Sequence, residues 1–462
     1  MKLCKREEVT RNMTLKDVTG KAARALDVFS LSIRALIDHF RAHVEGVTMS
    51  RVRWVLSVPA SWSDIAKQFM AASAMLAGIP EKQLIIALES EAAAIYCERL
   101  MSVKRKDKIS NNSISIDKDG TKFMMVDIGG GTTDITVLEK LPNNTMKQLC
   151  SSSGGNFGGM TVDEAFLNLL DEIFVGPVMR KLKTEEPQSY MDLLSSFEFL
   201  KRSINSETFG LVSLKIPYRV INELCKQESG QTLEKLIDSS EYKGKLVLEG
   251  STLKIQTELL KNFFNKPINK MIDLMKQSFK KCEPERVPII LLVGGFSECP
   301  LLQDAFKSEF PRKRIQFCSE PSLAVLKGAV MFGHDPNFIT SRVVRYTYGV
   351  EVSKDYDPRI HPEERRVIVG EEALCRGVFD AFMNAETSVP VGTAITEIYT
   401  TTEKFQAAHY LPIYISTSKN PQYTDDFESS YLGTVSVPIP NPTETFRDVK
   451  VNFYFGFTDL AI

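Results

Sequence analysis

The most constraining feature of the sequence is a run of three glycines between two strand-like segments, at Asp127-Ile128-Gly129-Gly130-Gly131-Thr132-Thr133-Asp134. Glycine is needed where backbone N–H groups approach phosphate oxygens, because a Cβ atom would stand in the way. The segment after the glycines alternates like a strand, so the turn joins two strands, whereas a Walker loop opens a helix. The Walker pattern GxxxxGK(S/T) is absent from the sequence. The motif therefore predicts a phosphate cradle of the strand-turn-strand kind.

The residues around these glycines predict a metal ion beside the phosphate. Asp127 ends a strand next to the cradle, and such a carboxylate suits Mg2+, which takes carboxylate oxygens directly or through water. Thr132 and Thr133 can donate hydroxyl hydrogen bonds to phosphate. The alternative is a plain glycine-rich β-turn. We favour the functional interpretation because it accounts for the flanking aspartates as well as for the glycines.

Three further elements are weak signals when each is taken alone. Gly294-Gly295 follows the apolar run IILLV, where a glycine pair lets a flat ring or a ribose lie against the backbone. Segment 153–159, SGGNFGG, is a permissive turn before a helix. Glu198, Lys201 and Arg202 share one helix face, because their spacings are three and four residues. For that face alone, a solvated set of ion pairs is the favoured interpretation.

The periodicity of the whole sequence divides the chain into an α/β part and an all-β part. The 462 residues exceed one ordinary core, so two or three domains are expected. Strand-like and helix-like runs alternate up to about residue 333, which is typical of α/β domains. After about residue 340, short β-branched or aromatic runs predict an all-β module of about seven strands. We expect domains at 1–340 and 341–462.

Apolar spacing locates the elements of the α/β part: a helix at 20–45, strands at 52–60 and 84–89, and helices at 61–79 and 90–101. Ser61 or Ser63 is the expected N-cap of its helix. A helix at 255–281 is expected to be interrupted near Pro267. Residues 102–121 are polar and predict an exposed loop. Its run KRKDK fits a solvated loop better than a nuclear-import patch.

Composition and charge argue against several classes of protein. Lys and Arg number 57 against 58 Asp and Glu, so a net charge of −1 gives no drive toward nucleic acid or an anionic membrane. No apolar run reaches the ~20 residues of a membrane span, and no signal-peptide core is visible. Eight cysteines lie scattered without CxxC pairs, which predicts free thiols in a reducing, cytoplasmic compartment and argues against a zinc site.

Together these motifs resemble the actin-like ATPase superfamily and, within it, the 70-kilodalton heat-shock protein family. The family's phosphate loop DxGGGTxD matches 127–134, and its adenosine loop VGGxxxxP matches 293–300. Its adenine-contacting pattern ExxKR matches Glu198, Lys201 and Arg202. The match is completed by VPASW at 58–62, LIIALESEAAAIYC at 84–97 and the turn at Gly154–Gly158. Runs such as VRWVLSVPASW are more similar to an atypical branch, the heat shock 70 kDa proteins 12A and 12B, than to the stress-inducible chaperones.

The resemblance implies an actin-like, ribonuclease H-like core of two lobes that binds ATP or ADP with Mg2+, followed by a β-sandwich for protein clients or signalling partners. It assigns Asp127, Glu89 and Asp134 to the catalytic set, and Asp127 also to the Mg2+. The nucleotide-binding residues implied by the resemblance are Gly129, Gly130, Gly131, Thr132, Thr133, Gly154, Gly155, Glu198, Lys201, Arg202, Gly294 and Gly295.

The sequence also departs from the family pattern. Nothing in residues 1–50 resembles the family's first phosphate loop or the lysine that follows it, which predicts an N-terminally truncated core without its first strands. Loss of about three backbone donors to phosphate, at about 1.5–3 kcal/mol each, amounts to roughly 4–9 kcal/mol. Even the lower value corresponds to about a thousandfold in affinity. Ser90, Ser322 and Glu298 stand where typical members have Pro, Asp and Arg, and no helical lid is expected after the sandwich.

We therefore expect an ATP-binding, chaperone-like protein with weak or absent ATPase activity. The alternative is a nucleotide-independent protein-interaction scaffold that keeps the fold. A sugar or acetate kinase of the same superfamily is disfavoured, because these kinases do not append an all-β module.

Overall fold

The computed structural model describes residues 9–17, 19–106, 116, 118–282, 287–401, 404–458 and 460–462. The chain divides into two compact units. Unit 1 comprises Met1–Asp117, Lys122–Thr136 and Ser153–Asp335, and unit 2 comprises Lys118–Thr121, Val137–Ser152 and Pro336–Ile462. Unit 1 mixes helices and strands, whereas unit 2 is rich in strands. The prediction of a mixed α/β part and a β-rich part is confirmed, but unit 2 also includes Lys118–Thr121 and Val137–Ser152, which lie inside the predicted domain 1–340.

Unit 1 is built around a sheet whose inner strands are buried. β12 (Ile289–Val293) lies between β13 (Arg314–Phe317) and β5 (Lys122–Ile128) and is parallel to both. The first half of β6 (Thr133–Lys140) follows β5, and β8 (Ser153–Gly155) pairs antiparallel with β6. All of β12 is buried, as expected for a parallel strand that is covered on both faces. The register sets Val293 beside Asp127, so the two glycine motifs leave the sheet at the same edge.

Unit 1 also contains the helices α3 (Glu89–Lys106), α4 (Met160–Ile173), α9 (Thr257–Lys281), α10 (Pro300–Glu309) and α11 (Ala324–His334). α3 packs against β5, and α11 packs against α3. These two helices meet at Gly328, where a Cβ atom would collide with the carbonyl group of Ala92. The close crossing therefore depends on this glycine.

Two expectations about these helices are wrong. α9 runs without interruption through Pro267, because buried residues on both sides of the proline, such as Phe264 and Met271, hold one face against the unit. α3 continues to Lys106, so the first residues of the expected loop 102–121 are helical. Lysine and arginine are good helix formers, which favours this extension. Residues 107–115 and 117 of that loop lie outside the described residues.

A second layer of unit 1 contains a short parallel pair with two helices. β3 (Trp54–Val58) pairs with β4 (Leu84–Leu88), and α1 (Ala25–His43) packs against α2 (Asp64–Leu76). The hairpin β1 (Thr14–Lys16) and β2 (Ala22–Arg24) precedes α1. Ser63 is the N-cap of α2, since its side chain accepts from the N–H of Ala66. The other candidate, Ser61, instead donates its N–H to Asp134 at 2.9 Å.

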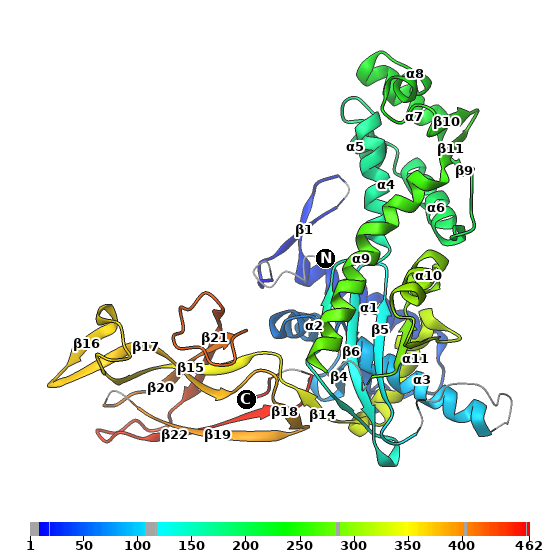
Figure 1. The fold of residues 1–462 in the computed structure, drawn as a ribbon. Helices are drawn as coiled ribbons and strands as arrows, with labels where there is room; N and C mark the ends of the chain where they lie inside the picture. The colour runs from blue at the N-terminus through cyan, green and yellow to red at the C-terminus, as the bar shows by residue number, and fades with distance from the viewer. Residues whose placement is uncertain are drawn as a thin grey trace. The chain divides into compact units, whose positions relative to one another are not determined.

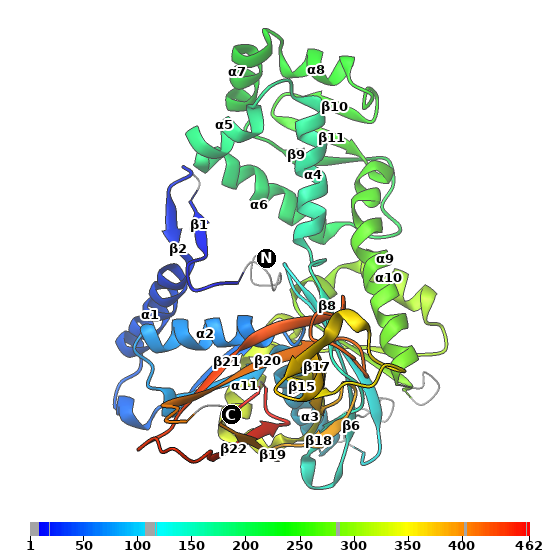
Figure 2. The ribbon, with the colours of Figure 1, turned by 90° about the vertical axis from the view of Figure 1, so that its left-hand side faces the viewer.

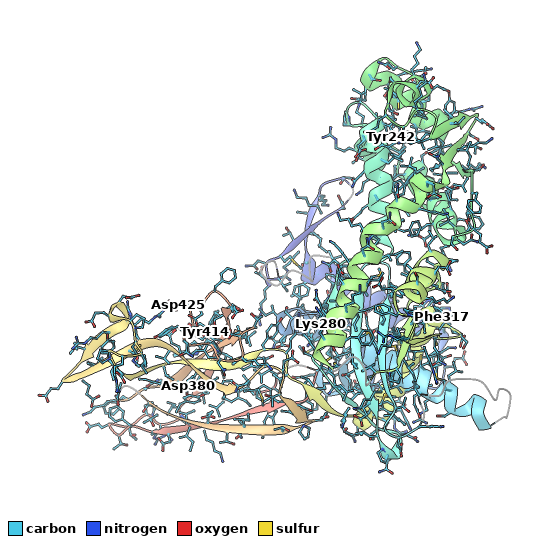
Figure 3. The ribbon with its side chains drawn as sticks, in the orientation of Figure 1. Tyr242, Lys280, Phe317, Asp380, Tyr414 and Asp425 are labelled. Atoms are coloured by element: carbon cyan, nitrogen blue, oxygen red, sulfur yellow. The ribbon has the colours of Figure 1, made fainter. Side chains whose placement is uncertain are left out.

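One end of unit 1 carries the elements between α4 and α9, as Figures 1 and 2 both show. They are α5 (Val178–Glu185), α6 (Pro187–Ser203), α7 (Tyr218–Ser229), α8 (Leu233–Ser239) and the antiparallel strands β9 (Leu211–Lys215), β10 (Leu246–Glu249) and β11 (Thr252–Gln256). Figure 3 places Tyr242 at this end, where its hydroxyl donates to Glu172 of α4. Of these elements the sequence predicted only a helix around Glu198, which corresponds to α6.

Unit 2 packs two antiparallel sheets around one apolar core. The larger sheet has the order β16 (Arg366–Val369), β17 (Glu372–Met383), β15 (Thr347–Asp355), β20 (Ala408–Ser416) and β21 (Ser429–Pro438). The smaller sheet pairs β19 (Thr393–Thr400) with β22 (Asp448–Phe455). Val350 and Ile413 of the larger sheet share a core with Val451 and Phe453 of the smaller one. Phe453 is fully buried and stacks on Phe382 at 4.1 Å between ring centroids.

Unit 2 also contains β7 (Met146–Gln148), β14 (Ile339–Val343) and β18 (Ser388–Pro390), with β14 between the other two. Among the described residues, β14 to β22 are nine strands with both ends counted, where the sequence predicted about seven. The strand β17 was missed because EALCRGVFDAFM mixes acidic, small and apolar residues without strict alternation. Short 3-10 helices occur at Met49–Arg51, Glu81–Gln83, Pro142–Asn144, Gly295–Glu298, Pro321–Leu323, Pro336–Phe338 and Glu363–Arg365.

The cysteines depart in part from the expectation of free thiols. Cys97, Cys225, Cys299, Cys318 and Cys375 are free and buried. Cys150 and Cys282 are disulfide-bonded, so the expectation of free thiols is wrong for these two. No helix in the described part of the chain is long and apolar enough to cross a membrane.

Phe453→Ala should strongly destabilise unit 2. Truncation of a fully buried phenylalanine removes the stacked contact with Phe382 and leaves a cavity, so we expect a loss of about 3–5 kcal/mol in the free energy of unfolding. Phe427→Ala is the matched control, because the Phe427 side chain is fully exposed, and it should change this free energy by less than about 0.5 kcal/mol. Urea unfolding followed by circular dichroism measures both. Equal losses of unfolding free energy in the two variants would contradict the placement of Phe453 in the core of unit 2.

Candidate nucleotide site

The candidate site begins where the two glycine-rich turns of unit 1 meet. The turn between β5 and β6 is closed by a hydrogen bond from the Gly129 N–H to the Thr132 carbonyl at 2.9 Å. The N–H groups of Gly159 and Met160 donate to the carbonyls of Gly129 and Gly130, at 3.1 and 2.8 Å. The second turn is therefore docked on the first by backbone hydrogen bonds.

The glycine triplet offers unfilled space and unused donors. A Cβ atom built on Gly130 or Gly131 would meet nothing within 4 Å, so both positions face open space. Within the described residues, the N–H groups of these two glycines make no hydrogen bond. Gly130 also lines a cavity of about 480 Å³. A cradle of this kind fits an anion with oxygen acceptors.

Three carboxylates interact electrostatically beside the turn between β5 and β6: Asp127 near the end of β5, Asp134 near the start of β6, and Glu89 directly after β4. Burial and the charge of Asp134 raise the pKa of Asp127 to about 7. Burial, followed by the charges of Asp127 and Asp134, raises the pKa of Glu89 to about 8. Glu89 is the first residue of α3, and Asp134 accepts the Ser61 N–H at 2.9 Å. Burial and like charges both favour the protonated carboxyl groups. Part of this cluster is therefore protonated at neutral pH.

The carboxylates do not form a metal site made of protein ligands alone. Within the described residues, no group of three or more His, Cys, Asp or Glu side chains is arranged to hold a metal ion. Mg2+ is commonly held by one or two carboxylates together with waters and substrate phosphates. Asp127 beside an open phosphate cradle fits that mode of binding. The assignment of Asp127 to Mg2+ stays a prediction.

Gly294 fixes the distance between the second glycine motif and Asp127. Its φ is +84°, a region that favours glycine, and a Cβ atom there would collide with the Asp127 carboxylate and the Ile128 carbonyl. The neighbouring Gly295 faces open space and lines the cavity. The pair therefore combines one glycine required by packing with one that borders the candidate binding space.

Lys201 is a buried, fully engaged cation. Its side chain is 4% exposed and lies 2.7 Å from Asp163, 2.5 Å from Glu198 and 3.3 Å from the Gly159 carbonyl. It therefore ties α6 to the start of α4. The solvated ion-pair face that we favoured for this helix alone does not describe Lys201, because tertiary packing buries it. Arg202 is exposed and pairs with Glu298 at 2.8 Å.

The cavity brings together five of the predicted residues, namely Gly130, Glu198, Lys201, Arg202 and Gly295. The others lie in the surrounding strands and turns. Thr133 is buried, and its hydroxyl donates to the Phe157 carbonyl at 3.1 Å, so that hydroxyl is already engaged. Gly154 lies against Ser61 and Asp134, and Gly155 lies against Phe157.

Met160 and Asp163 line the cavity but lie outside the motifs that the sequence singled out. Gly159, Phe296 and Cys299 also line it and lie inside the turn 153–159 and the loop 293–300, although no role was assigned to them individually. Asp163 had a usable signal, since it is an acidic residue in the first turn of the helix that follows the second glycine-rich turn. Met160 gave none, because an isolated apolar residue beside glycines is common in ordinary cores.

Comparison with known proteins decides the family. A family model described as Hsp70 protein matches residues 18–367, more than half of the chain. The chain belongs to the Hsp70 family. It is 31% identical to human heat shock 70 kDa protein 12A over 517 residues, covering 100% of this chain and 76% of that protein. It is 28% identical to human heat shock 70 kDa protein 12B, with the same coverage. The predicted resemblance to the 12A and 12B branch is confirmed.

More distant relatives belong to the same family. Chaperone protein DnaK of Mycoplasma mobile is 24% identical over 323 residues, covering 68% of this chain and 47% of that protein. Chaperone protein DnaK of Thermus thermophilus is 22% identical over 419 residues, covering 89% of this chain and 56% of that protein. This Hsp70-family chain is thus more similar to 12A and 12B than to these DnaK proteins.

Glu89→Gln should stabilise this Hsp70-family chain at alkaline pH. Folding raises the pKa of Glu89 to about 8, from ~4.3 for an unfolded glutamate. The stability that this group contributes is fully present below its unfolded pKa and is lost as the pH rises through about 8. Glutamine does not titrate, so the melting temperature of the variant should exceed that of the unsubstituted chain by an amount that grows between about pH 5 and about pH 8.5. Thermal melts without Mg2+ or nucleotide measure this, with Glu249→Gln as an exposed control. A pH-independent difference would contradict the buried cluster.

Gly294→Ala and Gly295→Ala should differ in their effect on the stability of unit 1. Gly294→Ala places a methyl group against Asp127 in a left-handed conformation, so it should lower the free energy of unfolding by more than about 1 kcal/mol. Gly295→Ala meets open space and should change it by less than about 0.5 kcal/mol. Urea unfolding of the two variants is the measurement. Comparable losses would refute the close approach at Gly294.

Proposed function

We propose that this Hsp70-family protein binds ATP or ADP with Mg2+ in the cavity of unit 1, with weak or absent hydrolysis. One observation carries the proposal: a single cavity is lined by Gly130 of the phosphate motif and by Glu198, Lys201, Arg202 and Gly295 of the two adenosine motifs. Those segments are distant in sequence. The family resemblance assigns all of them to one ligand, and their meeting in one cavity of suitable size supports that assignment.

The chemistry of the lining fits the parts of a nucleotide. The unused N–H groups of Gly130 and Gly131 suit phosphate oxygens. Carboxylates accept hydrogen bonds, so Glu198 and Asp163 suit the hydroxyls of a ribose. Met160 and Phe296 give apolar surface for a base. The actin-like arrangement of two lobes around the nucleotide remains part of the proposal.

Asp127 is the residue that we assign to Mg2+, through its own oxygens or through water. When bound, Mg2+ supplies positive charge to the phosphate oxygens. A cation near Asp127 also favours the ionised forms of Asp127 and Glu89, whose pKa values are raised by burial and by neighbouring carboxylates. Glu89 can then accept a proton from an attacking water, and Asp134 stays in the catalytic set as part of the proposal.

Phosphoryl transfer depends on positioning and charge stabilisation around the γ-phosphate. The two basic residues that line the cavity, Lys201 and Arg202, are both paired with carboxylates, which supports weak or absent hydrolysis. A chaperone-like role would use the β-rich unit 2 to contact protein clients or signalling partners. The second candidate is a nucleotide-independent protein-interaction scaffold that keeps the fold.

Calorimetric titration of Mg-ATP and Mg-ADP into the 462-residue chain tests the proposal. We expect saturable binding that Asp127→Asn weakens at least tenfold, because the amide cannot replace a carboxylate beside Mg2+. Asp273→Asn, on the exposed side of α9, is the matched control and should bind as the unsubstituted chain does. Circular dichroism establishes that each sample is folded. Absence of binding by a folded, unsubstituted chain would overturn the proposal and leave the scaffold.

A further inference from the structure

The rim of the unit 1 cavity carries an ion pair between two distant segments. Arg202 of α6 donates through Nη2 to Oε2 of Glu298, the last residue of the 3-10 helix Gly295–Glu298, at 2.8 Å. Both residues line the cavity. Their side chains are 63% and 40% exposed, whereas Lys201 on the same helix is 4% exposed. The pair therefore lies where the cavity opens to solvent.

Such a pair contributes more to orientation than to folding. Exposed ion pairs add little to stability, because water and salt screen them and because long side chains lose rotamer freedom on pairing. That lost freedom has a geometric consequence, since a single carboxylate holds one Nη of Arg202 in place. The guanidinium group is planar and stacks on aromatic rings. Its orientation decides whether a flat ligand entering the cavity meets a face or an edge of the cation.

Arg202 is also the cation at this rim that a ligand can reach. The other basic residue lining the cavity, Lys201, is held by Asp163, Glu198 and the Gly159 carbonyl and is buried. Typical members of the resembled family have an arginine where this chain has Glu298. The rim thus presents one cation held by a carboxylate in place of two cations.

We propose that Glu298 is a positioning residue that orients the Arg202 guanidinium for stacking on a flat ring in the cavity. This rests on the proposed function and assigns the ring to the adenine base of ATP or ADP. The apolar lining residues Met160, Phe296 and Cys299 suit the ring that such a cation covers. Glu298 acts on the ligand through Arg202.

A double-mutant cycle on the full chain tests this inference. The dissociation constant of Mg-ADP is measured by calorimetry at fixed ionic strength for Arg202→Ala, Glu298→Ala and the double variant. We expect each single variant to bind about three- to thirtyfold more weakly, the range that cation–π stacking contributes. The double variant should bind no more weakly than Arg202→Ala, because Glu298 has no effect without Arg202.

Further measurements separate positioning from structure. Glu298→Gln keeps a hydrogen-bond acceptor for Arg202, so it should restore part of the affinity lost in Glu298→Ala. The melting temperatures of the ligand-free variants should match that of Glu249→Ala, which removes an exposed ion pair with Lys254 outside the cavity lining and should leave ADP affinity unchanged.

Three outcomes would overturn the inference. Binding of ADP by Glu298→Ala within about twofold of the unsubstituted chain would show that the carboxylate does not position Arg202. Additive losses in the double variant would show that Glu298 acts independently of Arg202. Tighter binding by Glu298→Ala would show that the pair obstructs the cavity. If the unsubstituted chain binds no ADP, the proposed function fails, and this inference fails with it; if it binds ADP, the variants decide this inference alone.

Discussion

Two backbone hydrogen bonds hold the candidate site together, from the N–H groups of Gly159 and Met160 to the carbonyls of Gly129 and Gly130. They require a close approach of the two turns, because a Cβ atom on Gly158 would collide with both carbonyls. Helix α4 starts directly after this contact, so the contact fixes the place of Asp163 in its first turn. Asp163 in turn pairs with Lys201. The contact between the two glycine-rich turns therefore also determines where this part of the cavity wall lies.

The charged side chains on the two sides of this contact differ in how they are compensated. On the α6 side, Lys201 is buried with two carboxylates and a carbonyl around it. Even there, burial raises the pKa of Asp163 despite the opposing effect of Lys201. On the strand side, burial and neighbouring carboxylates raise the pKa values of Asp127 and Glu89. Under the proposed function, a cation bound near Asp127 would favour the ionised carboxylates, so cation binding and proton release would be linked events.

Much of the site could be predicted from the sequence, because it rests on glycines whose positions are dictated by backbone geometry. Gly294 is an example, since neither its φ nor its contact with Asp127 tolerates a side chain. Burial was harder to foresee. The spacing of Glu198, Lys201 and Arg202 puts them on one face, but only the docking of α6 on α4 decides that Lys201 is buried while Arg202 is exposed. Likewise, nothing in the local sequence shows that packing keeps α9 helical through Pro267.

The pairing of charges in the cavity also limits how phosphate would be held there. Within the part of the chain that the structure describes, the two basic side chains that line the cavity are each paired with carboxylates. Their charge is therefore largely neutralised before any ligand arrives. Under the proposed function, the negative charge of the phosphates has to be balanced by the N–H groups of Gly130 and Gly131 and by Mg2+ near Asp127. N–H dipoles carry only partial charges, so within the described lining of the cavity the full positive charge in that balance comes from the metal. Nucleotide binding should accordingly depend far more on Mg2+ than in a site where a free lysine faces the phosphates.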